Sequence, residues 1–135
     1  MSWEAPLHSV APAAYLPHRP PFLFLDRLLA VEPGVCATAR VRVTGFPGGY
    51  PPILLVESVA QLGGIAAARE GDGGGVLAAI DRAEFRDPVP NGATLTITAR
   101  IAKSFGPLHL VDGEVTSGDG TVATMTLTLK VGPLP

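Results

Sequence analysis

Residues 53–69 read ILLVESVAQLGGIAAAR, and this stretch decides the fold of the chain. If these residues form a helix, its apolar side chains lie on nearly all sides and not in a stripe on one side. This pattern is typical of a helix buried on nearly all its faces. Such a helix is about 25 Å long, enough to cross a small domain but short for a bilayer, and it contains Glu57 and Gln61. The stretch therefore predicts a core helix and not a membrane span.

Segments with the pattern of β-strands lie on both sides of this helix. Before it, we expect a strand over 22–32, a turn at 32–34 and a second strand over 38–44. After it, we expect four strands, at 76–86, 94–103, 108–116 and 121–131. Two of them, at 94–103 and 121–131, alternate between apolar and polar residues, as strands do when one face of their sheet is buried.

The order of these elements predicts the architecture. A single apolar helix can hide its whole circumference only if a curved sheet wraps it and a second subunit closes the remaining side. We therefore expect the α+β class and a hotdog fold, in which an antiparallel sheet of five to six strands curves around one long helix. The fold should form one domain over 1–135, with 1–15 flexible or containing a short helix at about 10–15.

The composition argues against several classes of function. The chain has 135 residues, a net charge of −2 and 16% charged residues, so it lacks the broad basic surface that nucleic-acid binding requires. Its N-terminus does not read as a secretory signal, and it has a lone cysteine, Cys36. No cluster has the spacing of metal ligands. We expect a cytoplasmic protein that binds neither nucleic acid nor a membrane and holds no metal.

Four motifs occur in an order that resembles a known family. They are LPHRPPFLFLDR at 16–27, FPG at 46–48, LLVESVAQ at 54–61 and FRDPVPNG at 85–92. Together they resemble the hotdog-fold 3-hydroxyacyl-(acyl carrier protein) dehydratases of fatty acid synthesis, over about 16–131. The resemblance implies a lyase that acts on an acyl-pantetheine thioester of acyl carrier protein or CoA, with no further cofactor. It also implies a homodimer or a trimer of dimers.

The chain departs from that family at two positions of the active site. In the family, a catalytic His directly precedes the FPG motif, and an acidic residue on the helix of the partner subunit completes the site. Glu57 matches the acid, but Gly45 stands where the His is expected. At the helix entrance Pro52 replaces a Gly, and it lacks the backbone N–H that the resemblance assigns to the thioester carbonyl oxygen. We therefore expect a degenerate active site.

Three residues are candidates for proton transfer. Glu57 is an isolated carboxylate in an apolar helix, where ionisation is expensive, so we expect it to be protonated, hydrogen-bonded to a neighbouring group or functional. His18 would supply an imidazole if its loop reaches the site, or else it is part of a structural turn. Tyr50 would donate a hydrogen bond, but a usual pKa near 10 makes it a poor base.

Five further residues are candidates for contact with a substrate: Phe46, Gly48, Ile53, Gln61 and Gly64. Gln61 lies one helical turn after Glu57 and either orients it or merely satisfies other polar groups. Gly64, like Gly63, weakens a helix by about 1 kcal/mol relative to Ala. Both glycines therefore indicate close passage of either a strand or an acyl chain.

The residues leave three functions open. The first is a dehydratase that works without the standard His, through His18 or Tyr50 or a His from another chain. The second is a thioesterase that uses Glu57 as base or nucleophile. The third is a noncatalytic subunit that binds acyl thioesters and pairs as a heterodimer with a competent hotdog subunit. The missing imidazole and N–H favour binding over autonomous dehydration.

Overall fold

The computed structural model describes residues 11–18, 22–68, 75–118 and 120–132. The long helix α1 spans Pro52–Ala67, and a single 3-10 turn, η1, spans Pro12–Ala14. The six strands are β1 (Arg27–Glu32), β2 (Cys36–Arg42), β3 (Gly75–Phe85), β4 (Thr94–Phe105), β5 (Leu108–Ser117) and β6 (Gly120–Val131). All six expected strands and the expected helix are thus present. Residues 1–10 lie outside the described residues.

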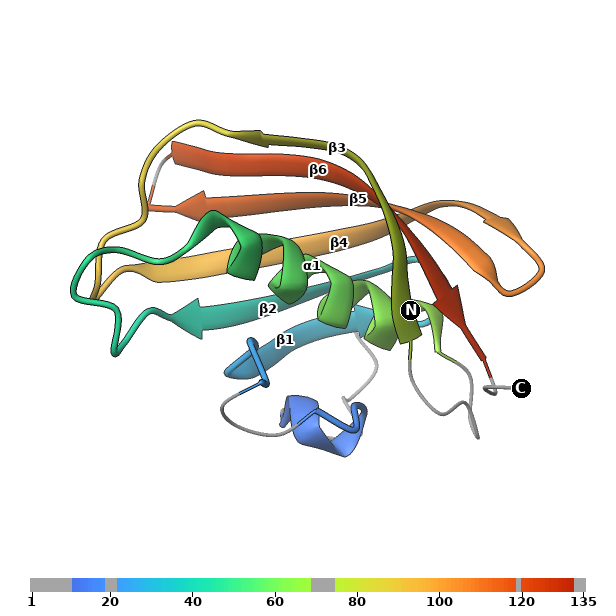
Figure 1. Cartoon of the computed structure of the whole chain (residues 1–135). Helices are drawn as coiled ribbons and strands as arrows, with labels where there is room; N and C mark the ends of the chain where they lie inside the picture. Colours follow the sequence, from blue (N-terminus) through green and yellow to red (C-terminus); the bar gives the residue numbers. More distant parts are fainter. Residues whose placement is uncertain (1–10, 19–21, 69–74, 119, 133–135) are drawn as a thin grey trace.

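The strands form one antiparallel sheet in the order β1-β2-β4-β5-β6-β3. Helix α1 lies across one face of this sheet, and the strands curve around it (Figure 1). This is the expected hotdog arrangement. The turn at 32–34 is confirmed, since Val35 N–H donates to Glu32 O at 2.9 Å and Gly34 has a φ of 79°. No helix among the described residues is long and apolar enough to cross a membrane.

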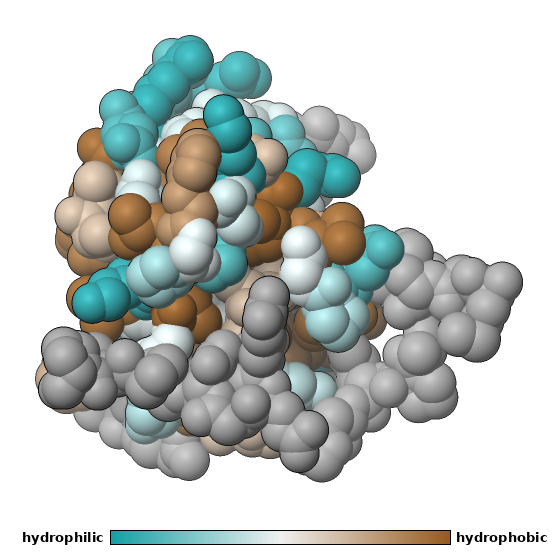
Figure 2. Space-filling view, turned by 90° about the vertical axis from the view of Figure 1, so that its right-hand side faces the viewer, coloured by the Kyte–Doolittle hydropathy of each residue, from teal (hydrophilic) through white to brown (hydrophobic). Residues whose placement is uncertain are grey.

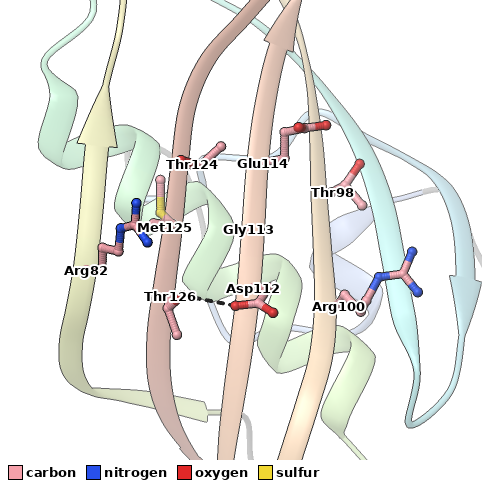
Figure 3. Close-up of a pocket in the computed structure, with 9 residues that line it drawn as sticks. All are labelled: Arg82, Thr98, Arg100, Asp112, Gly113, Glu114, Thr124, Met125 and Thr126. Carbon is pink, nitrogen blue, oxygen red and sulfur yellow. Dashed lines mark hydrogen bonds between the residues drawn. The ribbon is translucent and has the colours of Figure 1, made fainter.

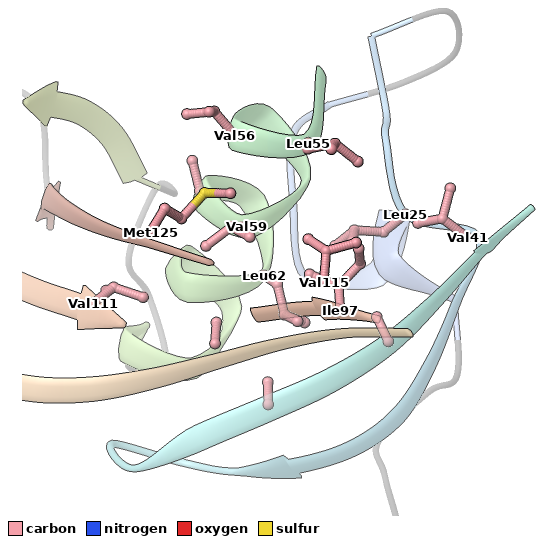
Figure 4. Close-up of a cluster of buried hydrophobic side chains, with 14 of the residues drawn as sticks. Leu25, Val41, Leu55, Val56, Val59, Leu62, Ile97, Val111, Val115 and Met125 are labelled. Carbon is pink, nitrogen blue, oxygen red and sulfur yellow. The ribbon is translucent and has the colours of Figure 1, made fainter. Parts of the chain in front are cut away.

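The core lies between α1 and the inner face of the sheet. In β4, Leu95, Ile97 and Ala99 are fully buried while the residues between them are partly exposed, which confirms the alternation seen in the sequence. Residues Val56, Val59 and Leu62 of the helix and Val111, Val115 and Met125 of the sheet are among the side chains that pack there (Figure 4). Burial of these side chains drives the helix onto the sheet.

One glycine of α1 is explained by this packing. A Cβ atom on Gly63 would lie 2.8 Å from Leu129 Cδ1 and 3.2 Å from Val111 Cγ1. Real side chains do not approach so closely, so the sheet leaves no room for a larger residue. Of the two explanations that the sequence left open, close passage of a strand is therefore correct for Gly63.

The predicted start of the first strand is wrong. We expected strand from residue 22, but β1 begins at Arg27. Pairing with β2 extends back only to Asp26, whose N–H donates to Arg40 O at 3.0 Å, and the backbone of residues 22–24 is hydrogen-bonded to helix side chains instead. Ser58 Oγ donates to Phe24 O at 2.9 Å, and Phe24 N–H donates to Gln61 Oε1 at 2.9 Å. These bonds tie residues 22–24 to α1.

Two surfaces of the sheet are relevant to assembly. Strand β3 forms one edge and exposes Val76, Ile80 and Phe85 by 49%, 46% and 43%. At the end of the molecule that carries the β4–β5 hairpin, apolar side chains lie exposed among polar ones (Figure 2). Phe105 and Leu108 flank that hairpin and are 60% and 40% exposed. Exposed apolar residues therefore occur along β3 and at this hairpin, and others lie elsewhere on the described surface, among them Phe22 and Ile53.

Candidate functional site

Three of the predicted site residues meet beside α1. Gln61 Nε2 donates a hydrogen bond of 3.1 Å to Glu57 Oε1 across one helical turn. His18 Nε2 lies 4.0 Å from the same oxygen. The side chains of His18 and Glu57 are 26% and 35% exposed, so both remain accessible to solvent. Glu57 is therefore hydrogen-bonded to a neighbouring group, which is one of the three outcomes expected for it, and it also lies beside an imidazole.

Gln61 is held in place by the backbone that precedes β1. Its Oε1 accepts from Phe24 N–H, and its Nε2 donates to Phe22 O, each at 2.9 Å. The residue is 3% exposed. Both predicted roles are therefore present, because Gln61 satisfies two backbone groups and also fixes the position of the Glu57 carboxylate.

A cavity of about 230 Å³ lies at this cluster, between α1 and the start of β3. The described residues that line it are Leu16, His18, Glu57, Ala60, Gln61, Gly64, Gly75, Val76, Leu77 and Leu129. Four predicted site residues, namely His18, Glu57, Gln61 and Gly64, therefore share one cavity. We call this cavity the helix groove.

One wall of the helix groove is formed by a strand, and the sequence did not predict the residues of this strand as site residues. Gly75, Val76 and Leu77 come from β3, which begins one residue before the predicted strand of residues 76–86. One signal was available. Because only a short connection joins the helix to the next strand, the start of that strand must lie close to the end of the helix.

A second group of predicted residues lies in the loop before α1. The rings of Phe46 and Tyr50 meet edge to face, with centroids 4.9 Å apart. Tyr50 lines two cavities, one of about 620 Å³ with Gly48 and one of about 320 Å³ with Gly45 and Phe46. The lining of the helix groove does not include these residues. Within one chain, the structure does not bring them to Glu57.

Tyr50 is less suited to proton transfer than an exposed tyrosine. It is 7% exposed, and this burial raises the pKa of its phenol above the ordinary value of 10.0. A hydrogen bond with Ser58 lowers the pKa, and the charge of Asp26 raises it. Because burial is the largest of these effects, Tyr50 stays protonated at neutral pH, and its hydroxyl can take part in hydrogen bonds but is not a base.

The remaining predicted positions lie near the start of α1. Ile53 is 59% exposed. Pro52 is the first residue of the helix and has no N–H, so this position cannot supply the donor that the family resemblance places there. Gly45 is exposed and has a φ of 81°, a conformation that favours glycine.

Another pocket lies on the opposite face of the sheet. It measures about 400 Å³, and Figure 3 shows its side chains in front of the strands, with α1 behind them. Arg82 and Arg100 flank Asp112 and Glu114, and Asp112 Oδ1 accepts a hydrogen bond of 3.0 Å from Thr126 Oγ1. This mixture of charges is typical of the solvated face of a sheet, and no predicted site residue lines the pocket.

Comparison with known proteins identifies the class and then the family. A model of the Thioesterase superfamily matches residues 59–124. With the fold, this match defines a hotdog protein. A 3-hydroxyacyl-(acyl-carrier-protein) dehydratase FabZ from Campylobacter fetus subsp. fetus is 34% identical over 131 residues, which cover 83% of this chain and 88% of the relative. The FabZ of Herpetosiphon aurantiacus is 38% identical over 122 residues, 81% and 86% of the two chains. The chain belongs to the FabZ dehydratase family.

A solved structure supports the fold over nearly the whole chain. The dehydratase heterocomplex ApeI:P from Xenorhabdus doucetiae contains a chain that matches with a TM-score of 0.78 at 17% identity. The match covers 94% of this chain and 93% of the other. At this identity the likeness confirms the hotdog fold.

Proposed function

We propose that this protein binds an acyl-pantetheine thioester, carried by an acyl carrier protein or CoA, with the acyl chain beside Glu57. It would act in cytoplasmic fatty acid, polyketide or related acyl metabolism. The observation that carries the proposal is the helix groove, in which His18, Glu57 and Gln61 meet in a member of the FabZ family. An apolar cavity with a few convergent polar groups is the usual form of a small-molecule site.

The chemistry of dehydration makes this a degenerate site. Removing water from a 3-hydroxyacyl thioester needs a base for the C2 proton, an acid for the departing hydroxyl and a donor for the thioester oxygen. Glu57 offers one proton-transferring group, whereas Gly45 offers no imidazole and Pro52 no N–H. A lost general acid or base alone costs about 100-fold to 10,000-fold in rate. Binding is therefore the function that the residues support best.

The site is completed by a second subunit in this proposal. The helix groove and the loop of residues 45–50 belong to different cavities of one chain, so the loop that approaches Glu57 would come from a partner. The edge strand β3, with Val76, Ile80 and Phe85 exposed, offers a surface for that partner. In a homodimer, alone or as a trimer of dimers, the partner's loop would place Gly45 beside Glu57. A heterodimer with a hotdog subunit that keeps its His would present an imidazole.

The position of His18 favours a second candidate, dehydration by the chain itself. With Nε2 at 4.0 Å from Glu57 Oε1, the imidazole is close enough to share a proton with Glu57 through a water or a substrate hydroxyl. A thioesterase is the alternative. In it, Glu57 would activate a water molecule that attacks the thioester, and the partly exposed carboxylate and the superfamily match both fit this function.

An activity assay separates these functions. The purified chain is incubated with 3-hydroxyacyl thioesters of acyl carrier protein and of CoA, and enoyl product and free thiol are both measured. We expect binding without turnover, and turnover only with a His-containing hotdog partner that co-purifies with the chain. Enoyl product from the chain alone, lost in His18→Asn, would replace this proposal with dehydration. Thiol release lost in Glu57→Gln would replace it with thioester hydrolysis.

A further inference from the structure

Two glycines meet at the end of the helix groove that lies furthest along α1 from Glu57. A Cβ atom built on Gly75 would lie 3.7 Å from Gly64 Cα, and one built on Gly64 would lie 4.0 Å from Gly75 N. These distances are ordinary van der Waals contacts, so the backbones of α1 and β3 nearly touch at this point. The cavity therefore ends where the helix meets the first residue of the strand.

The groove is polar at its other end. Glu57 and His18 lie there, while Ala60 and Gly64 continue the same helix face one and two turns further. Leu16, Val76, Leu77 and Leu129 add larger apolar side chains to its walls. Seven residues of helix separate Glu57 from Gly64, a distance of about 10 Å. The helix groove, which we also call the slot, therefore has its acid–base groups at one end and only apolar residues and glycines at the other.

We propose that Gly64 sets the length of acyl chain that this protein accepts, because it forms the end of the slot together with Gly75. This inference rests on the proposed acyl-thioester function. The thioester and its neighbouring carbons would lie at Glu57, and the methyl end would lie at Gly64. A cavity of about 230 Å³ holds about eight groups the size of a water or a methylene. Because the thioester also takes part of this volume, the preferred chain is a straight one of at most about eight carbons.

Gly64 is the position at which this idea can be tested without damage to the fold. Its added Cβ atom would have no heavy atom nearer than 4.0 Å, so Ala fits and its methyl group enters the slot. At Gly75, an added Cβ atom would lie 3.1 Å from Val131 Cγ2, which is too tight for a clean substitution. The variants are therefore Gly64→Ala and, for a larger effect, Gly64→Leu.

The experiment measures affinity as a function of chain length. The probes are acyl-pantetheine amides from butanoyl to dodecanoyl, which carry nitrogen in place of the thioester sulfur and are not turned over. For the wild-type chain, calorimetry should show affinity rising about fourfold per methylene and levelling off near octanoyl. In Gly64→Ala the octanoyl probe should lose at least about fourfold, while butanoyl is unchanged. Gly64→Leu should move the plateau to still shorter chains.

The control variant is Gly120→Ala, at the start of β6. Its added Cβ atom would have only Ser117 O near it, at 3.9 Å, and it does not line the groove. It should keep the wild-type profile, and thermal unfolding should show that all three variants are folded. Equal profiles for wild type and Gly64→Ala would overturn the inference and leave the proposed function intact. No binding of any amide by the wild type would overturn both.

Discussion

Gln61 joins two parts of the molecule, since the amide nitrogen that binds Glu57 Oε1 at 3.1 Å also binds Phe22 O at 2.9 Å. The carboxylate of the candidate site is thus fixed relative to the backbone that leads from His18 into β1. This relationship makes the orientation of Glu57 depend on a residue that need not touch a substrate.

Replacing Gln61 should therefore weaken both stability and the site. Gln61→Leu would leave Phe24 N–H and Phe22 O without their partner, at a cost of about 2–4 kcal/mol in free energy of unfolding. Urea denaturation measures this loss. The comparison is Glu57→Gln, which keeps both backbone bonds and should change stability by less than about 1 kcal/mol. Equal effects of the two variants would argue against the anchoring role.

Neighbouring glycines of α1 should respond in opposite ways to the same substitution. Gly63→Ala should lower the free energy of unfolding by about 1–3 kcal/mol, since the new methyl group would press on Leu129 and Val111. Gly64→Ala should raise it by up to about 1 kcal/mol, because Ala favours helix and has room. Thermal unfolding of the two variants tests the pair. A destabilised Gly64→Ala would mean that the slot is narrower than described.

Restoring an imidazole at the loop should create dehydratase activity. Since no turnover is expected from the wild-type chain, we expect Gly45→His to form enoyl product about 100-fold faster than the background reaction without protein, the lower end of the range for a general acid or base, because Pro52 still lacks its N–H. The φ of 81° at Gly45 adds strain of about 1–2 kcal/mol, but there is open space for the side chain. Absorbance of the enoyl product measures the rate.

The matched control for that variant is Gly106→His. Gly106 also has a positive φ, 58°, and open space around it, but it lies in the hairpin between β4 and β5. It should show the same strain and no gain in rate. If Gly45→His is folded and equally inactive, the loop of residues 45–50 does not meet Glu57 in the assembled protein.

Tyr50 should make stability depend on pH at the alkaline end. Burial raises the pKa of its phenol, so the folded chain holds this proton more tightly than the unfolded chain. The corresponding stability is complete below about pH 10, the unfolded pKa, and is lost as pH rises through the higher folded value. Urea unfolding across this range should show a decline that is smaller in Tyr50→Phe. If Tyr50→Phe loses stability as steeply as the wild type, groups other than Tyr50 cause the loss of stability at high pH.

The strands and the core could be predicted from the sequence because their signal is local. The alternation of apolar and polar residues predicted the ends of β4 and β6 to within two residues. The apolar residues on all sides of the helix over 53–69 predicted α1 equally well. The pair of Glu57 and Gln61 was also foreseeable, since residues one turn apart on a helix always face each other.

The contacts that define the site depend on long-range packing instead. Residues 22–24 look like strand by composition, but their hydrogen bonds go to helix residues 34 to 39 positions away. The approach of His18 to Glu57 and the meeting of Gly64 with Gly75 depend on how the chain returns to the helix. The spacing of apolar residues does not show which distant segments pack against the helix. The sequence therefore could not decide whether His18 reaches Glu57 or what passes close to Gly64.

The central claim is that an acyl thioester binds in the helix groove, and chemical-shift mapping tests it most directly. The chain is titrated with an octanoyl-pantetheine amide and the backbone amide resonances are followed. We predict saturable shifts at Glu57, Gln61 and Gly64 and at the start of β3, with no change at Asp112 and Thr98 on the opposite face of the sheet. Shifts confined to that opposite face, or no shifts at any concentration, would contradict the account.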